Sequence, residues 1–230
     1  MALIDCHVLT LPRFKPEWLE DMRRDLDDEP VTQHWLAGID GDLGASRAAA
    51  FALGSAPFVS SQDPDDRLTR GVYAALLQAL ADNPAAPFAW AGERVVDDQL
   101  NPMPGRPHIW PGGYSPLSHV RKGQHVHGVK LYRRELVMPL LDGMRGAGLC
   151  CEFFLDYRLA KPWVRQPEAA WPVHVPMVGR LWRWHPEQGS KSFKTADFDQ
   201  MARALGFESM EALRESAWDA YGKSQGDCDD

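Results

Sequence analysis

The chain has 230 residues, of which 44% are hydrophobic, 25% charged and 10% aromatic. These proportions are those of an average soluble globular protein, and they exclude disordered, collagen-like, coiled-coil and disulfide-framework proteins. The formal net charge is -7, so the chain lacks the strong positive field of a non-specific nucleic-acid binder. A chain of this length can bury a sizeable core, either in one large α/β domain or in two small ones.

The first part of the chain alternates between short apolar runs and helical patterns. We expect strands at 3–11, 31–39 and 57–61, and helices from Pro16, over 46–53 and over 68–80. Gly54 is placed to end the second helix, and Asn83-Pro84 the third. This alternation predicts a doubly wound, mostly parallel sheet and therefore the α/β fold class.

The rest of the chain is less regular. We expect strands at 88–96, 126–132 and 173–184 (the last a strand pair), a helix at 134–144 and two helices within 195–221. Residues 151–159 fit a helix or a strand equally well. The proline-rich segment 97–124 has no clear period, which predicts a binding loop or lid.

The cysteines and the N-terminus indicate a compartment. The four cysteines form no Cys-x-x-Cys pair, and Cys6 lies in an apolar run, as expected of a core residue. The first residues lack the basic and apolar regions of a signal peptide, and no stretch approaches the roughly 18 apolar residues that span a bilayer. We therefore expect a protein without a membrane span in the reducing cytoplasm.

The strongest local signal is an acidic loop, with Asp63, Asp65 and Asp66 directly after an expected strand. Ligands of parallel sheets gather at the carboxyl ends of the strands. Carboxylates are preferred ligands of Mg²⁺ or Mn²⁺, and such an ion can bridge a diphosphate. The alternative is that Asp65 or Asp66 caps the following helix.

The run from Ser46 to Val59, together with this loop, resembles a motif of family 2 glycosyltransferases with the GT-A fold. That motif is A-R-N-x-G-x-x-x-A-x-G-x-x-I-x-x-x-D-x-D-D. Arg47 and the acids are in register, Ala52 and Gly54 resemble the Ala-x-Gly of the motif two residues earlier, and Ala48 and Ala50 replace the usual Asn and first Gly. The resemblance implies a GT-A-like three-layer sandwich with a mostly parallel, Rossmann-like central sheet.

The resemblance also implies roles on the side of the donor, a nucleotide-diphosphate sugar. Leu11, Pro12 and Arg13 would form the nucleotide loop, Asp40 would contact the nucleobase, and Arg47 would belong to the donor site. Asp63 would face the ribose and Asp65 the Mn²⁺ or Mg²⁺, while Asp66 helps to hold the loop. The run Leu181–Ser190 resembles the closing aromatic-Arg-x-His-x-x-x-Ser element of the family. There His185 would reach the metal or the diphosphate, and Ser190 or Lys191 a phosphate.

A catalytic base follows from two further matches. The run Gly128–Glu135 resembles the acceptor-side strand that ends in Arg-Arg-Glu, and 151–159 resembles a Glu-Asp motif closed by Arg-Leu. This register places Glu152 where the catalytic Asp stands, with Asp156 as the substitute. Such a base removes a proton from the acceptor hydroxyl, and the product would be inverted. Glu152 could instead form an ion pair with Arg158 or Arg145.

The acceptor side is less defined. On a strand, His125 and His127 would point to one face, as a zinc pair, as acceptor-loop residues or as surface histidines. We assign both to acceptor binding, with Arg133 from the only locally basic stretch and Trp184, whose ring could stack on a sugar or a base. Those basic residues could also lie on a solvated face. A glycan, a protein, a small molecule or a modified nucleic-acid base would all serve as acceptor.

We therefore expect one GT-A-like domain over 1–230, with a nucleotide-sugar half (1–98), an acceptor half (99–192) and a helical tail (193–230). The expected reaction is metal-dependent transfer of a sugar from its nucleotide diphosphate to an acceptor hydroxyl. A nucleotidyltransferase is one alternative, although the glycine-rich, lysine-containing loop of many such enzymes does not follow Leu11. The other is a catalytically silent module that binds a sugar or a nucleic acid.

Overall fold

The computed structural model describes residues 2–39, 41–105, 107, 109, 113–122, 126–185 and 193–222. Their central feature is a seven-stranded sheet with the order β2-β1-β3-β6-β5-β7-β4. The strands are β1 (Ile4–Thr10), β2 (Val31–Ala37), β3 (Phe58–Gln62), β4 (Arg67–Leu68), β5 (Phe88–Val96), β6 (Val129–Arg133) and β7 (Val173–Arg183).

The sheet is mixed, so the expectation of a mostly parallel sheet is wrong. β1 pairs in parallel with β2 and β3, and β5 pairs in parallel with β7. β6 runs antiparallel to both β3 and β5, and β4 runs antiparallel to β7. A parallel neighbour requires a connection that runs back along the full length of the strands. The chain between β5 and β6 instead enters β6 from the edge at which β5 ends, so β6 runs antiparallel to β5.

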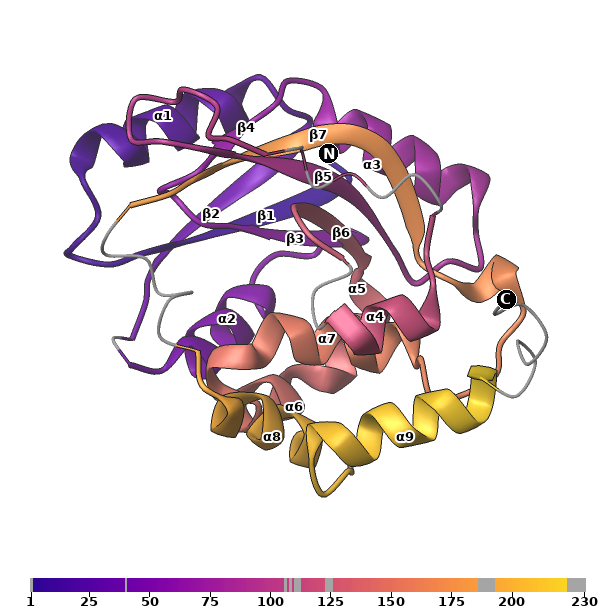
Figure 1. Ribbon diagram of the computed structural model, residues 1–230. Coiled ribbons are helices and arrows are strands. Elements are labelled where there is room, and N and C mark those ends of the chain that lie inside the picture. Colours follow the sequence, from indigo (N-terminus) through magenta and orange to yellow (C-terminus); the bar gives the residue numbers. More distant parts are fainter. Residues whose placement is uncertain are drawn as a thin grey trace.

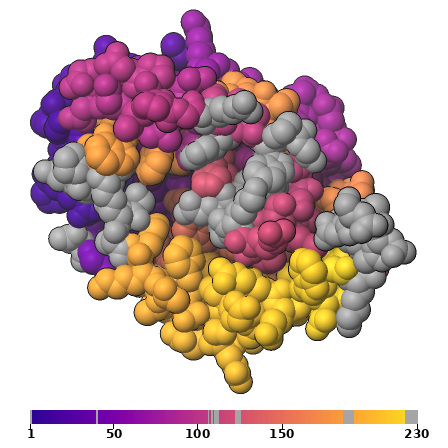
Figure 2. All heavy atoms as spheres, in the orientation of Figure 1, coloured from indigo at the N-terminus to yellow at the C-terminus, as the bar shows by residue number. Residues whose placement is uncertain are grey.

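Helices cover both faces of the sheet and make a three-layer α/β/α arrangement (Figure 1). One face carries α1 (Pro16–Asp27) and α3 (Val72–Asp82). The other carries α2 (Leu43–Phe51), α4 (Pro116–Lys122), α6 (Leu141–Gly146), α7 (Cys151–Ala160), α8 (Thr195–Ala204) and α9 (Met210–Tyr221). The short α5 (Arg134–Val137) follows β6 directly. In the space-filling view, α8 and α9 form the lower surface, in orange and yellow (Figure 2).

Two apolar clusters, one on each face of the sheet, form the core. Between the sheet and α1 and α3, the cluster includes Ile4, Cys6, Val8, Met22, Leu26, Leu76 and Leu80. The cluster under the other helices includes Phe51, Trp90, Phe154, Leu155, Met201 and Leu213. Because successive strand residues point to opposite faces, Asp5 and His7 of β1 face the layer that contains α2.

The expected elements are present, with local differences. The helix expected at 134–144 is divided by Pro139 into α5, a 3₁₀ turn (Met138–Leu140) and α6. Residues 151–160 form a helix, 173–183 form one long strand rather than a pair, and the segment 97–124 contains α4. Within the described residues, no helix is both long and apolar enough to cross a membrane.

The C-terminal end of α2 is held to β1 by polar contacts. Asp5 accepts hydrogen bonds from the Ala56 N–H (2.8 Å) and from the Arg134 guanidinium (2.6 Å). Arg134 also donates to the carbonyls of Phe51, Leu53 and Ala56, at 3.0, 2.9 and 2.6 Å. A cation that binds the last carbonyls of a helix also complements the negative end of its dipole.

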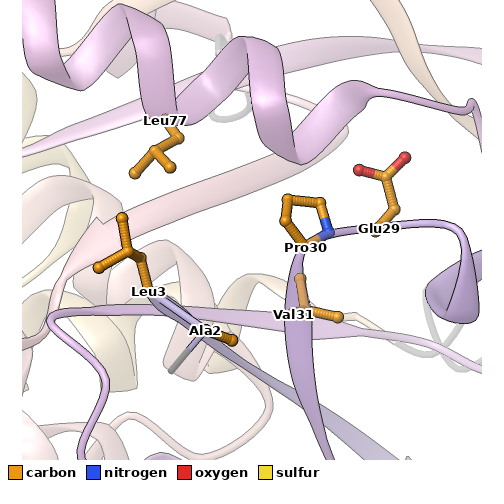
Figure 3. Close-up of a pocket in the computed structure, with 6 residues that line it drawn as sticks. All are labelled: Ala2, Leu3, Glu29, Pro30, Val31 and Leu77. Atoms are coloured by element: carbon orange, nitrogen blue, oxygen red, sulfur yellow. The ribbon is translucent and has the colours of Figure 1, made fainter.

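A cavity of about 300 Å³ lies at the edge of the sheet where β1 and β2 begin (Figure 3). Its lining is mostly apolar: Ala2, Leu3, Pro30, Val31 and Leu77, with Glu29 as the one carboxylate. Glu29 accepts hydrogen bonds from Gly71 N–H and Tyr73 N–H (3.1 Å), so it caps the start of α3. The acidic loop after β3 lies at the opposite edge of the sheet, where β1, β2 and β3 end.

Gly54 provides a stability test of the α2 contact. Its φ is +78°, and an added Cβ would lie 2.1 Å from Asp5 Oδ2. Gly41 has the same φ of +78° but has nothing within 4 Å of an added Cβ. We expect Gly41→Ala to lower the free energy of unfolding by about 1 kcal/mol. Gly54→Ala should lower it by about 2 kcal/mol more than Gly41→Ala does, because of the clash with Asp5. Urea unfolding measures both, and equal losses would contradict the proposed clash.

His7 predicts a pH dependence of stability. Its ring nitrogens lie 3.1 Å from the Ser60 carbonyl and 3.2 Å from the Leu53 carbonyl, and burial lowers its pKa to about 4 although both carbonyls favour the charged form. The unfolded chain therefore binds this proton near pH 6.5 and the folded chain near pH 4, so stability is lost as the pH falls between these values. The unfolding free energy should fall by about 3 kcal/mol more in the wild type than in His7→Gln between pH 7 and pH 4. Parallel pH profiles of the two proteins would exclude this role of His7.

Candidate active site

The candidate site lies at the carboxyl ends of β1, β2 and β3. Thr10 of β1 is paired with Ala37 of β2, so Leu11–Arg13 and the residues after β2 leave the sheet at the same edge. Gly38 N–H donates to the Thr10 carbonyl (2.8 Å), and an added Cβ at Gly38 would lie 3.2 Å from Leu11 Cδ2. The acidic loop follows β3 at this edge, as predicted. Asp40 lies outside the described residues.

A buried guanidinium connects the acidic loop to α7. Arg47 of α2 is 2% exposed, and its Nη2 forms an ion pair with Asp63 Oδ1. Arg47 Nε lies 2.9 Å from Glu152 Oε1, and the Ser61 hydroxyl donates to the same oxygen at 2.9 Å. The predicted donor residue Arg47 therefore holds the predicted ribose ligand and the predicted base beside each other. Glu152 pairs with Arg47 rather than with Arg158 or Arg145.

Glu152 and Asp156 lie one turn apart on α7 but have different surroundings. The Glu152 side chain is 31% exposed. Burial raises the pKa of Glu152, whereas Arg47, Lys130 and the Ser61 hydrogen bond lower it. The lowering effects together are larger, so the pKa is below its ordinary value. Asp156 is 1% exposed, accepts from Tyr132 O–H (2.8 Å) and pairs with Lys130, and burial raises its pKa to about 6. Asp156 therefore anchors α7 to β6, and Glu152 is the more exposed of the two carboxylates.

The two predicted metal ligands are in contact although they are far apart in sequence. His185 Nε2 lies 2.9 Å from Asp65 Oδ2. The imidazole packs against Trp18 of α1, with 4.8 Å between ring centroids. Asp66 accepts from the Arg183 N–H (2.9 Å) and lies 3.4 Å from Arg180 Nη1, which fixes the loop. Because α3 begins at Val72 and Glu29 caps it, the alternative that these acids cap the helix is wrong.

The residues present fit a divalent cation in donor type. Asp65 would offer it a carboxylate oxygen and His185 an imidazole nitrogen, two atoms that lie 2.9 Å apart and are hydrogen-bonded to each other. No group of three or more His, Cys, Asp or Glu side chains placed to hold a metal occurs among the described residues. Two protein ligands suit Mg²⁺ or Mn²⁺, which usually keep water or phosphate oxygens as further ligands.

Other predicted residues are distributed differently. Arg133 lies where β3 and β5 begin, away from the acidic loop, and its guanidinium donates to the carbonyls of Ala86 (2.9 Å) and Leu80 (3.0 Å). It therefore holds the C-terminal end of α3, which does not place it at an acceptor. Trp184 is 44% exposed beside His185. His125, Ser190 and Lys191 lie outside the described residues.

Sequence reasoning missed four polar residues of this edge, namely Ser61, Glu93, Lys130 and Arg180. Three of them are charged residues within the largely apolar strands β5, β6 and β7, and that was the available signal, because a buried charge requires a partner. Glu93 of β5 is in register with Arg180 of β7, and Arg180 donates to it (Nε to Oε2, 3.0 Å). His127, which the sequence did single out, lies beside Glu93, with 3.4 Å between its Nδ1 and Glu93 Oε1.

The chain resembles solved structures of S. aureus TarS, a family 2 glycosyltransferase with the GT-A fold. The match to TarS 1–349 has a TM-score of 0.63 and 9% sequence identity, and covers 97% of this chain and 73% of that one. The fold is GT-A-like.

The likeness extends to ligand complexes of TarS. TarS 1–349 with UDP-GlcNAc matches with a TM-score of 0.60, and with UDP with 0.62, each at 10% identity and over 97% of this chain. The chain spans 44% of a longer TarS structure. No protein-family model and no curated protein sequence matches the chain.

Proposed function

We propose that this protein is a glycosyltransferase that moves a sugar from a nucleotide-diphosphate donor to an acceptor hydroxyl. The observation that carries the proposal is the contact of Asp65 with His185, and the pairing of both Asp63 and Glu152 with Arg47, at the carboxyl edge of a GT-A-like sheet. Ligands of α/β sheets bind at this edge. The TarS complexes with UDP and UDP-GlcNAc support a uridine nucleotide as the first donor to test.

In this proposal the nucleoside lies at the ends of β1 and β2, near Leu11–Arg13, and Asp63 faces the ribose. Asp65 and His185 would hold Mn²⁺ or Mg²⁺, which offsets negative charge on the leaving diphosphate when bound. Among the described residues of this edge, carboxylates outnumber the cations that pair with them, which favours a cation in the site. The carboxylates are Asp63, Asp65, Asp66, Glu93, Glu152 and Asp156, and the cations that pair with them are Arg47, Lys130 and Arg180.

The proposed chemical step is a single displacement. The acceptor oxygen attacks the anomeric carbon, the bond from that carbon to the diphosphate oxygen breaks, and the acceptor proton passes to Glu152. Attack from the face opposite the leaving group inverts the anomeric carbon. Glu152 is ionised at neutral pH because its pKa is below the ordinary value, and it is more exposed than Asp156.

Asp65 tests the metal and nucleotide site. Calorimetric titration of UDP, GDP and dTDP, with and without Mn²⁺, identifies the nucleotide. We expect Mn²⁺ to raise its affinity in the wild type, and Asp65→Asn to remove about tenfold or more of that gain, because the carboxamide is a weaker ligand for a hard cation. Asp28→Asn is the matched control, since Asp28 is exposed at the amino end of β2. Wild-type affinity in Asp65→Asn would contradict the assignment.

Glu152 tests the chemical step. Release of the nucleotide from its sugar donor, with water as acceptor, should slow by about 10²- to 10⁴-fold in Glu152→Gln, while the nucleotide dissociation constant stays within about twofold. Asp156→Asn should lose thermal stability and much less turnover, because Asp156 is an anchor. The opposite pattern would make Asp156 the base. Metal-dependent nucleotide binding without turnover in the wild type would indicate a binding module.

A further inference from the structure

The carboxyl edge of the sheet continues beyond the acidic loop to a row of charged residues. Ala91 of β5 is paired with Val129 of β6, so Glu93 lies level with His127, which precedes β6 by two residues. On its other side Glu93 is in register with Arg180 of β7. Close contacts between these side chains follow the same order, from His127 through Glu93 to Arg180 and on to Asp66.

This row combines a fixed carboxylate with an accessible imidazole. Glu93 is 3% exposed and is held by Arg180, so its position is set by buried contacts. The His127 side chain is 28% exposed, with Nδ1 3.4 Å from Glu93 Oε1. A carboxylate that faces one ring nitrogen orients the ring, and Nε2 then lies on the opposite side of the imidazole.

The location of the row indicates what the imidazole would meet. A nucleotide sugar bound in the proposed way has its nucleoside at β1 and β2 and its diphosphate at the loop after β3. The sugar is the next group along the edge, in the direction of β6 and β5. His127 lies at the end of β6 that adjoins this position, and Asp66 connects the row to the acidic loop (3.4 Å to Arg180).

We propose that His127 binds a hydroxyl of the donor sugar through Nε2, and that Glu93 is its positioning residue. This inference rests on the proposed function and adds a specificity contact to it. A sugar hydroxyl can both donate and accept, so one hydrogen bond forms with Nε2. The nucleoside diphosphate alone lacks the sugar that is transferred, and in this proposal it makes no contact with His127.

Two substitutions of His127 separate a substrate contact from a structural one. In His127→Asn the amide lies near the position of Nδ1 and can still meet Glu93, but nothing replaces Nε2. In His127→Gln the amide reaches the position of Nε2. Calorimetry with Mn²⁺ measures the dissociation constants of the nucleoside diphosphate and of the corresponding nucleotide sugars. An example is UDP compared with UDP-GlcNAc, UDP-glucose and UDP-galactose.

The measured quantity is the dissociation constant of the nucleoside diphosphate divided by the dissociation constant of the nucleotide sugar that binds most tightly. We expect His127→Asn to lower this ratio by about 3- to 10-fold, the loss of one hydrogen bond, and His127→Gln to retain it within about twofold. The diphosphate constant itself should not change. His174→Ala is the control, because His174 is half-buried near the start of β7.

Glu93→Gln tests the positioning role. It should lower the ratio less than His127→Asn does, because its amide oxygen can still face Nδ1, and it should have no effect in the His127→Asn background. Equal effects of Glu93→Gln in both backgrounds would overturn its role. A wild-type ratio in His127→Asn would overturn the sugar contact while nucleotide binding, and with it the proposed function, stands. If the wild type binds no nucleoside diphosphate, both proposals fail.

Discussion

The arrangement of the site depends on one buried guanidinium. Arg47 comes from α2, its partner Asp63 follows β3, and its partner Glu152 lies in the first turn of α7, so one side chain joins three elements from both halves of the chain. A guanidinium is always charged and offers several donors in one plane, and it can bind two carboxylates at once. Without Arg47 the two acids would repel each other at close range. Removing one partner of a buried ion pair typically costs about 3–5 kcal/mol.

The position of Arg47 is in turn fixed by both ends of α2. At the first turn, an added Cβ at Gly44 would lie 2.7 Å from the Met144 carbonyl, so only glycine permits this approach of α2 to α6. At the last turn, Arg134 binds the carbonyls of Phe51 and Leu53 and the carboxylate of Asp5. A helix held at both ends cannot shift along the sheet. Contacts that involve no substrate therefore determine where Asp63 and Glu152 lie.

Local patterns predicted most of the elements but not how they pair. Apolar periodicity located β1, α1 and α3, and the order of motifs brought Asp65 and His185 together across 120 residues. Periodicity carries no information on strand direction, and β6 was therefore placed in a mostly parallel sheet. Arg133 was assigned to the acceptor because its stretch is basic, whereas its guanidinium binds helix carbonyls. Which of Glu152 and Asp156 is buried depends on Lys130 and Tyr132, and these contacts are not local in sequence.

The charges at the carboxyl edge place a constraint on any nucleotide that binds there. In the part of this edge that the structure describes, carboxylates outnumber the cations that pair with them, and the whole chain has a net charge of -7, so a diphosphate would meet repulsion. A divalent cation between Asp65 and the diphosphate would reverse the sign of that interaction. Since the coupling between two ligands is reciprocal, a cation that promotes nucleotide binding is itself bound more tightly with the nucleotide present. In the proposed function two protein ligands are therefore enough, because the substrate supplies the remaining oxygens.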